Sequence, residues 1–115
     1  MNKNKFHILM VDDDDRIREL VREYLVKNNF LVTTAKDAFD ATKKLEIIKF
    51  DILILDIMMP GKSGLSLTKE IKKNNPTPIL LFYHVSRLLL LKVLLALDYF
   101  FLFLSSKIDR PLLAS

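Results

Sequence analysis

The sequence contains no cysteine, which excludes disulfide bonds and thiolate metal sites and favours a cytoplasmic location. It has neither a basic helix nor a run of basic residues interleaved with aromatics, although its net charge is +4. A lysine-rich surface in water therefore explains the charge better than a nucleic-acid binding face does. No signal peptide is expected, because four aspartates follow the first short apolar run.

The length of the chain bounds its architecture. A sequence of 115 residues, of which 50% are hydrophobic, supports one domain with a modest core. We expect residues 1–115 to form a single domain, and we expect no DNA-binding domain because no length remains for one.

Four short apolar runs predict β-strands, at Ile8 to Val11, Phe30 to Thr34, Asp51 to Ile57 and Ile79 to Phe82. The third run is apolar on both faces and ends near a Pro-Gly turn, which is typical of a strand inside a parallel sheet. Helical segments separate the runs. This alternation predicts an α/β fold with a doubly wound parallel sheet, right-handed crossovers and helices on both faces.

The helical segments are indicated by apolar residues at helical spacing. The first is expected to carry one apolar stripe, made of Ile17, Leu20, Val21, Tyr24 and Leu25. The second has an inner face of Ala38, Ala41, Leu45 and Ile48, and the third is indicated by Leu65, Leu67, Thr68 and Ile71. Asp14 or Asp15 can cap the first helix and Asp37 the second, because a carboxylate accepts from the free N–H groups of a helix start.

Carboxylates follow two of the predicted strands. Asp56 ends the third strand, since Pro60-Gly61 interrupts it just beyond, and Asp12 to Asp15 follow the first strand. An ionised group in such an apolar setting is costly unless it has a role, and α/β sheets place their sites at the carboxyl ends of strands. If the two strands are parallel neighbours, these carboxylates meet. As single residues, Asp12 or Asp13 would be ordinary turn aspartates.

From Phe6 to about Phe82, the sequence resembles the CheY-like receiver domain of two-component response regulators. The resemblance rests on I-L-M-V-D-D-D at 8–14, on D-I-L-I-L-D-I-M-M-P-G at 51–61 with Gly64, and on P-T-P-I-L-L-F at 76–82. It implies a flavodoxin-like (βα)5 fold. It also implies a phosphoacceptor signalling domain rather than an enzyme, with a sensor histidine kinase or a phosphotransfer protein as its partner.

The resemblance also implies roles for single residues. Asp56 would accept the phosphoryl group, Asp13 would bind Mg²⁺ directly, and Asp12 would hold a metal-bound water. Met58 would offer its backbone carbonyl to the same ion; without the resemblance, Met58 would be core or loop filler. A hard divalent cation with oxygen ligands would relieve the repulsion among three carboxylates at one edge.

After Phe82, the sequence departs from the family pattern. Tyr83 stands where the family has a switch Thr or Ser, and Leu102 and Phe103 stand where it has Lys-Pro. We therefore expect residues 1–82 to be family-like and residues 83–115 to be divergent, with a fold that is incomplete or altered after the fourth strand. A pseudo-receiver that docks to partners without switching stays open as an alternative function.

The divergent part is dominated by an apolar tract from Val85 to Leu104. Lys92 and Asp98 inside the tract argue against a membrane span. Its aromatic end, Tyr99 to Leu104, suggests a fifth strand. The tract could also form the surface of a homodimer, or aggregate in a defective fragment.

Overall fold

The computed structural model describes residues 6–82 together with residues 98, 99 and 102. Residues 7–82 alternate between strand and helix, as predicted. The elements are β1 (His7–Val11), α1 (Asp15–Lys27), β2 (Leu31–Ala35), α2 (Ala38–Ile47), β3 (Ile52–Asp56), α3 (Gly64–Asn74) and β4 (Ile79–Phe82). The first three strands differ from the predicted ranges by one residue at one or both ends, and β4 coincides with its prediction.

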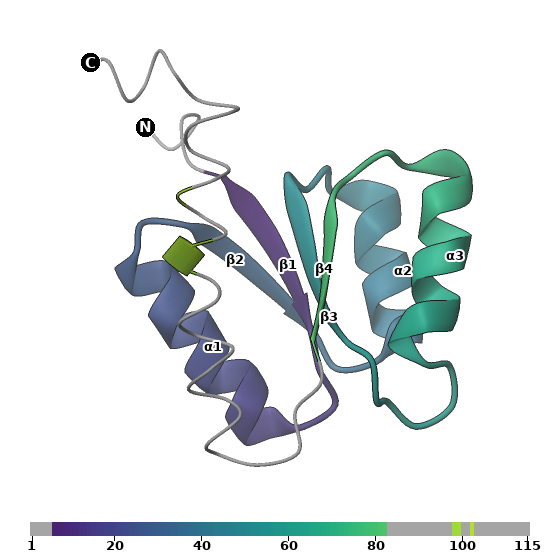
Figure 1. The fold of residues 1–115 in the computed structure, drawn as a ribbon, viewed down its shortest axis with the longest axis horizontal. Coiled ribbons are helices and arrows are strands. Elements are labelled where there is room, and N and C mark those ends of the chain that lie inside the picture. The colour runs from purple at the N-terminus through teal and green to yellow at the C-terminus, as the bar shows by residue number, and fades with distance from the viewer. Residues whose placement is uncertain (1–5, 83–97, 100–101, 103–115) are drawn as a thin grey trace. The chain divides into compact units, whose positions relative to one another are not determined.

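The four strands form one parallel sheet in the order β2-β1-β3-β4. The chain moves from β1 outward to β2 and then crosses to the other side of β1 to form β3. Because right-handed crossovers in opposite directions place helices on opposite faces, α1 covers one face and α2 and α3 cover the other (Figure 1). The prediction of a doubly wound sheet with flavodoxin-like order is confirmed for this part of the chain.

The core lies on both faces of the two central strands. Residues of β1 and β3 that share the α2–α3 face pack against the inner sides of both helices; this cluster includes Leu9, Val11, Leu53, Leu55, Ala38, Ala41, Leu67 and Ile71. The alternate residues of the same strands are also fully buried, and they are Ile8, Met10, Ile52 and Ile54. Burial on both faces explains the continuous apolar run that the sequence shows at β3.

Two apolar residues of the predicted helices face outward instead of inward. Leu20 is 44% exposed and Leu65 is 51% exposed. Consecutive helical residues point about 100° apart. Leu20 is therefore turned away from its buried neighbour Val21, and Leu65 from the buried Gly64. The apolar stripe predicted for the first helix was too wide, because helical spacing alone does not locate its edge.

The predicted caps at Asp14 and Asp37 are confirmed. The Asp14 carboxylate accepts from the backbone N–H of Arg16 at 2.9 Å and of Ile17 at 3.2 Å. The Asp37 carboxylate accepts from the N–H of Asp40 at 2.8 Å. Asp14 rather than Asp15 is thus the N-cap of α1.

The described residues beyond β4 are Asp98, Tyr99 and Leu102, and their backbone is helical. The fifth strand suggested for Tyr99 to Leu104 is therefore wrong at the two of its residues that the structure describes. Aromatic residues favour strands only where a sheet packs against them, whereas the leucines of this tract are good helix formers. The other residues of the apolar tract lie outside the described part. Among the helices that are described, none has the length and apolar character to cross a membrane.

Candidate functional site

The sheet register brings the predicted acidic residues to one edge. Val11 pairs with Leu55, so Asp12 and Asp56 follow at neighbouring positions on adjacent strands. The Asp12 N–H donates to the Ala35 carbonyl at 3.1 Å, which extends the β1–β2 pairing by one residue. The carboxyl ends of β1 and β3 therefore meet, as the sequence required for a shared site.

Asp12, Asp13 and Asp56 form a compact carboxylate cluster. Each can offer one oxygen such that the three oxygens lie within 4.8 Å of one another. Asp12 and Asp56 are fully buried, whereas Asp13 is exposed to solvent. Oxygen ligands on opposite sides of a Mg²⁺ ion lie about 4 Å apart, so small side-chain rotations suffice for a common ion. The donor set, all carboxylate oxygens, fits a hard divalent cation.

Backbone hydrogen bonds orient both buried carboxylates. The N–H of Met58 donates to Asp56 Oδ1 at 3.0 Å, and the N–H of Asp14 donates to Asp12 Oδ1 at 2.9 Å. In each case an aspartate at a strand end accepts from the residue two positions later, which is the local bond that lets aspartate begin a turn. Met58 thus contacts Asp56 through its N–H. Its carbonyl as a metal ligand stays a prediction.

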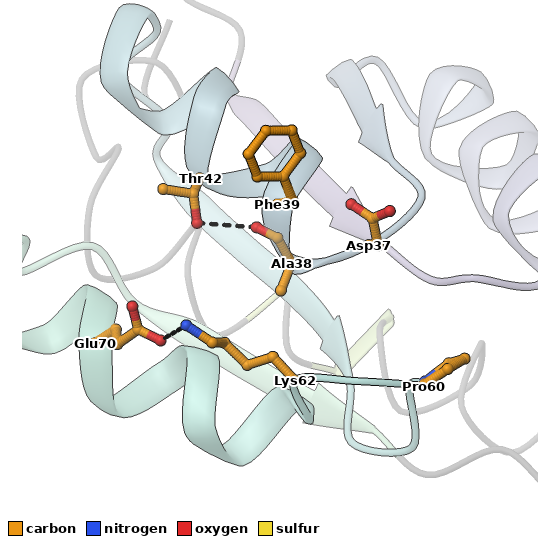
Figure 2. A pocket seen from close by; sticks show the side chains of 7 residues that line it. All are labelled: Asp37, Ala38, Phe39, Thr42, Pro60, Lys62 and Glu70. Carbon is orange, nitrogen blue, oxygen red and sulfur yellow. Dashed lines mark hydrogen bonds and ion pairs between the residues drawn. The ribbon is translucent and has the colours of Figure 1, made fainter.

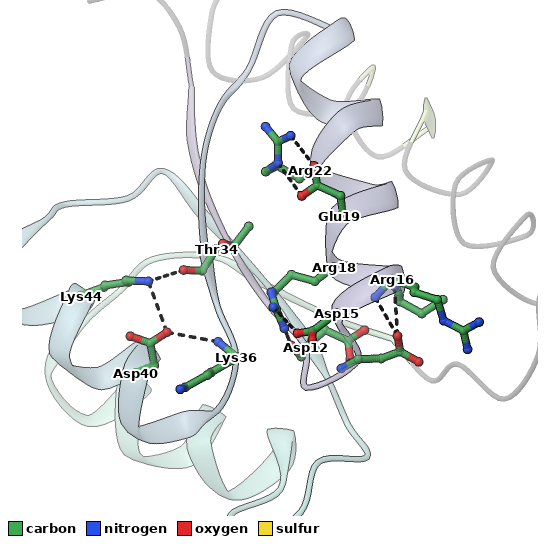
Figure 3. A network of polar contacts seen from close by, with 12 residues as sticks. Asp12, Asp15, Arg16, Arg18, Glu19, Arg22, Thr34, Lys36, Asp40 and Lys44 are labelled. Atoms are coloured by element: carbon green, nitrogen blue, oxygen red, sulfur yellow. Dashed lines mark hydrogen bonds and ion pairs between the residues drawn. The ribbon is translucent and has the colours of Figure 1, made fainter.

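The turn between β1 and α1 is tied to α1 by Arg18, a residue outside the apolar stripe predicted for the first helix. Arg18 Nη1 donates to the Asp12 carbonyl oxygen at 2.8 Å, and Nη2 pairs with the Asp15 carboxylate (Figure 3). The three-residue spacing of Asp15 and Arg18 on a helix could have predicted the ion pair. The bond to the Asp12 carbonyl had no sequence signal.

The loop between β3 and α3 depends on its two glycines. Gly61 has a φ of 77°, in the left-handed region that glycine adopts without strain. Gly64 begins α3, and its N–H donates to the Ile57 carbonyl at 3.1 Å.

A groove of about 480 Å³ lies beside this loop, between the start of α2 and α3. It is lined by Asp37, Ala38, Phe39, Thr42, Pro60, Lys62 and Glu70, with an ion pair between Lys62 and Glu70 (Figure 2). The acidic cluster does not line this groove.

A second polar network holds the end of β2, next to Asp12. Lys44 Nζ donates to the Thr34 carbonyl and, at 3.2 Å, to Asp40 Oδ2, which also accepts from the Lys36 N–H (Figure 3). Burial raises the pKa of Asp40, but these hydrogen bonds and the nearby lysine charges outweigh it, so the pKa lies below its ordinary value. The network stabilises the strand end to which the Asp12 N–H is bonded.

Tyr83 and Leu102 were predicted to stand at the switch positions of the family. Tyr83 lies outside the described residues. Leu102 is an exposed residue with helical backbone, and its apolar side chain has no donor or charge to offer a phosphoryl group.

Comparison with known proteins identifies the family. Residues 8–90 match the model of the response regulator receiver domain. The chain belongs to the response regulator receiver domain family. Receiver domains are signalling domains of two-component systems. This receiver sequence is 47% identical over 81 residues to Protein PetR of Rhodobacter capsulatus, a match that covers 70% of this chain and 34% of PetR.

A second relative is the transcriptional regulatory protein ResD of Bacillus subtilis. It is 37% identical over 78 residues, covering 68% of this chain and 32% of ResD. The chain therefore spans about a third of the length of these curated relatives.

Solved structures agree with the fold of the described receiver residues. The response regulator TrrA of Thermotoga maritima, crystallised with Mg²⁺-BeF, has a TM-score of 0.66 and 40% sequence identity, covering 70% of this chain and 71% of TrrA. TrrA in complex with the histidine kinase ThkA gives a TM-score of 0.65, also at 40% identity, covering 71% of this chain and 72% of the matched chain. The receiver fold predicted from the sequence is thereby confirmed.

Proposed function

We propose that this receiver domain accepts a phosphoryl group on Asp56 from the phosphohistidine of a sensor kinase or phosphotransfer protein. The observation that carries the proposal is the convergence of Asp12, Asp13 and Asp56, whose carboxylate oxygens lie within 4.8 Å of one another at one sheet edge. Burying two carboxylates beside a third is costly, and an acceptor site with a bound cation supplies a reason for it.

The residues of the chain have separable tasks in this transfer. An oxygen of Asp56 forms the bond to phosphorus while the bond from phosphorus to the histidine nitrogen breaks. The Met58 N–H, at 3.0 Å from Asp56 Oδ1, holds the carboxylate in one orientation. Positioning and charge stabilisation are the main contributions a protein can make to phosphoryl transfer, so a fixed acceptor oxygen is what the reaction requires.

Asp12, Asp13 and Asp56 are the residues that would hold Mg²⁺, with the Met58 carbonyl as a further ligand by resemblance to the family. When bound, Mg²⁺ neutralises negative charge on the phosphoryl oxygens. The complex of TrrA with Mg²⁺-BeF supports this assignment at 40% identity. The complex of TrrA with the kinase ThkA supports a histidine kinase as partner. We further propose a cytoplasmic location, which the absence of cysteine favours.

The divergent C-terminal part motivates a second candidate function. By the resemblance, Tyr83 and Leu102 stand where the family has the Thr or Ser and the Lys that respond to phosphorylation. A chain with an intact acidic cluster and altered switch positions would bind partners, and even accept a phosphoryl group, without changing conformation. We further propose a homodimer through the apolar C-terminal region, which gel filtration of the purified protein tests.

A phosphorylation assay tests the transfer itself. The purified protein is incubated with acetyl phosphate and Mg²⁺, and its intact mass is measured beside Asp56→Asn and a matched control, Asp51→Asn. Asp51 is an exposed aspartate just before β3, at the end of the strand opposite Asp56. We expect a phosphoryl adduct in wild type and in Asp51→Asn, and none in Asp56→Asn.

If folded wild-type protein forms no phosphoryl adduct, phosphoryl transfer to Asp56 is contradicted. The candidate that remains is a module that docks to partners without being phosphorylated. If the adduct forms, amide NMR spectra with and without the phosphodonor test the switch. Shifts confined to residues around Asp56 support a non-switching receiver, whereas shifts that extend through β4 and beyond support a switching one.

A further inference from the structure

Asp12 is held by three described hydrogen bonds. Its N–H donates to the Ala35 carbonyl at 3.1 Å, its Oδ1 accepts from the Asp14 N–H at 2.9 Å, and its carbonyl accepts from Arg18 Nη1 at 2.8 Å. Two of these bonds have backbone N–H donors. The bond to Ala35 extends the sheet, and the bond from Asp14 belongs to the turn after β1. The third comes from a side chain, so a substitution at residue 18 can remove it while the donors of the other two bonds stay unchanged.

Arg18 is itself fixed in this position. Its side chain is only 19% exposed, and its second terminal nitrogen pairs with the Asp15 carboxylate. A guanidinium group has several donors in a rigid plane and can therefore bridge two acceptors at once. Here it bridges the carbonyl of residue 12 and the side chain of residue 15 (Figure 3). The bridge closes the turn that carries Asp13.

We propose that Arg18 is a positioning residue for the metal site, acting on Asp12 and Asp13 through the backbone of their turn. The proposal rests on the cation site of the proposed function. Without the bridge, the turn gains conformations in which the carboxylates of Asp12 and Asp13 no longer converge with Asp56. Removing a residue that orients a metal ligand without binding the metal itself typically weakens metal binding by about 10- to 100-fold.

The charge of Arg18 makes this proposal sharply testable. A cation bonded to the turn that carries Asp12 and Asp13 opposes the binding of another cation there, so removing the charge alone would strengthen metal binding. Removing the bridge would weaken it. The two roles therefore predict changes of opposite sign for the same substitution.

The neighbouring Arg22 supplies a matched control. It lies one turn further along α1 and bonds to Glu19, and both side chains of this pair are more than a third exposed. The described contacts of Arg22 lie within the helix surface, with no bond to the strand end. Substituting it removes the same charge from the same helix without touching the turn.

The test measures the affinity for Mn²⁺, with the electron paramagnetic resonance signal of free Mn²⁺ as the readout. The proteins are wild type, Arg18→Ala, Arg18→Lys and Arg22→Ala. We expect about tenfold weaker binding in Arg18→Ala. We expect a smaller loss in Arg18→Lys, whose compact ammonium keeps the charge but bridges the two acceptors less well. Arg22→Ala is expected to bind as wild type does.

Tighter binding in Arg18→Ala, or unchanged binding in both Arg18 variants, would overturn the proposal. Urea unfolding of each variant shows whether it is folded, and Arg18→Lys carries the test if Arg18→Ala is not. The acetyl phosphate assay is run in parallel so that the two proposals can fail separately. Wild type that binds Mn²⁺ but takes no adduct refutes phosphoryl transfer alone. Wild type that binds no Mn²⁺ refutes the positioning role as well.

Discussion

Gly64 lies directly against the backbone of Asp56. A Cβ at position 64 would lie 2.9 Å from the Asp56 carbonyl carbon and 3.0 Å from Ile57 Cα, and closer still to the Asp56 carbonyl oxygen. These are backbone atoms of β3 and its end, so they cannot move aside as the tip of a flexible side chain can. The start of α3 therefore packs closely against the backbone of Asp56, the residue that we propose as the phosphoacceptor.

Replacing Gly64 with alanine should displace Asp56. We expect Gly64→Ala to lower the free energy of unfolding by about 1–3 kcal/mol, the usual cost of forcing an extra carbon into a packed site. Mn²⁺ affinity should fall with it, because the acceptor carboxylate moves relative to Asp12. Urea unfolding and the Mn²⁺ titration measure the two effects.

The control for this substitution is Gly61→Ala. Gly61 has a φ of 77° but no atom within 4 Å of an added Cβ. Alanine there costs only the backbone strain of a left-handed conformation, about 1–2 kcal/mol. Its Mn²⁺ affinity should match that of wild type. Equal loss of affinity in both variants would show that general destabilisation, rather than the contact with Asp56, is responsible.

Metal should stabilise the fold through the acidic cluster. A ligand that binds only the folded state, at ten times its dissociation constant, raises the free energy of unfolding by about 1.4 kcal/mol. We expect Mg²⁺ to raise the melting temperature of wild type relative to EDTA. The increase should shrink in Asp13→Asn, which loses a charged oxygen ligand, and persist in Asp51→Asn. A shift of equal size in all three proteins would mean that Mg²⁺ acts elsewhere.

Asp14 should behave as a helix cap and not as a metal ligand. Its carboxylate accepts from two N–H groups of α1. Asp14→Ala should therefore lower the free energy of unfolding by about 1 kcal/mol, whereas Asp14→Ser, which keeps an acceptor oxygen, should lose much less. Both variants lose the same charge, so their Mn²⁺ affinities should agree. A lower affinity in Asp14→Ala that serine restores would link the cap to the metal site.

The Asp40 network should give a pH-dependent contribution to stability. Burial raises the pKa of Asp40, but its hydrogen bonds with Lys36 and Lys44 lower the pKa below its ordinary value overall. A carboxyl group with a depressed folded-state pKa stabilises the fold above the unfolded-state pKa of about 3.9 and loses this contribution as the pH falls through the folded-state value. Asp40→Asn should therefore cost about 0.5–1 kcal/mol near neutral pH, with the difference from wild type vanishing in acid.

Glu19 supplies the comparison for that measurement. The hydrogen bond from Arg22 also holds the pKa of Glu19 below its usual range, but the pair lies in solvent. We expect Glu19→Gln to unfold at the same urea concentration as wild type at every pH. A pH-independent effect of Asp40→Asn would show that its hydrogen bonds, and not its charge, stabilise the β2–α2 connection.

The strands and helices of residues 7–82 could be predicted because their signals are local. A continuous apolar run predicted β3, and Asp14 and Asp37 marked the helix starts that the structure shows. Local patterns were insufficient where a neighbour decides the outcome. Helical spacing did not show that Leu20 faces solvent, and aromatic content predicted a strand at Tyr99, where the backbone is helical.

The order of the elements, and the position of each aspartate at a strand end, were determined by the sequence alone, because both follow from local patterns of apolar and turn-forming residues. The tertiary structure decided which strand ends are adjacent. The β1–β3 register sets Asp12 beside Asp56, and packing brings Arg18 to the Asp12 carbonyl and Gly64 to Asp56. Some of these contacts join segments that are distant along the chain, and the Arg18 contact depends on the conformation of a long side chain. Their geometry exists only once the sheet and its helices have packed.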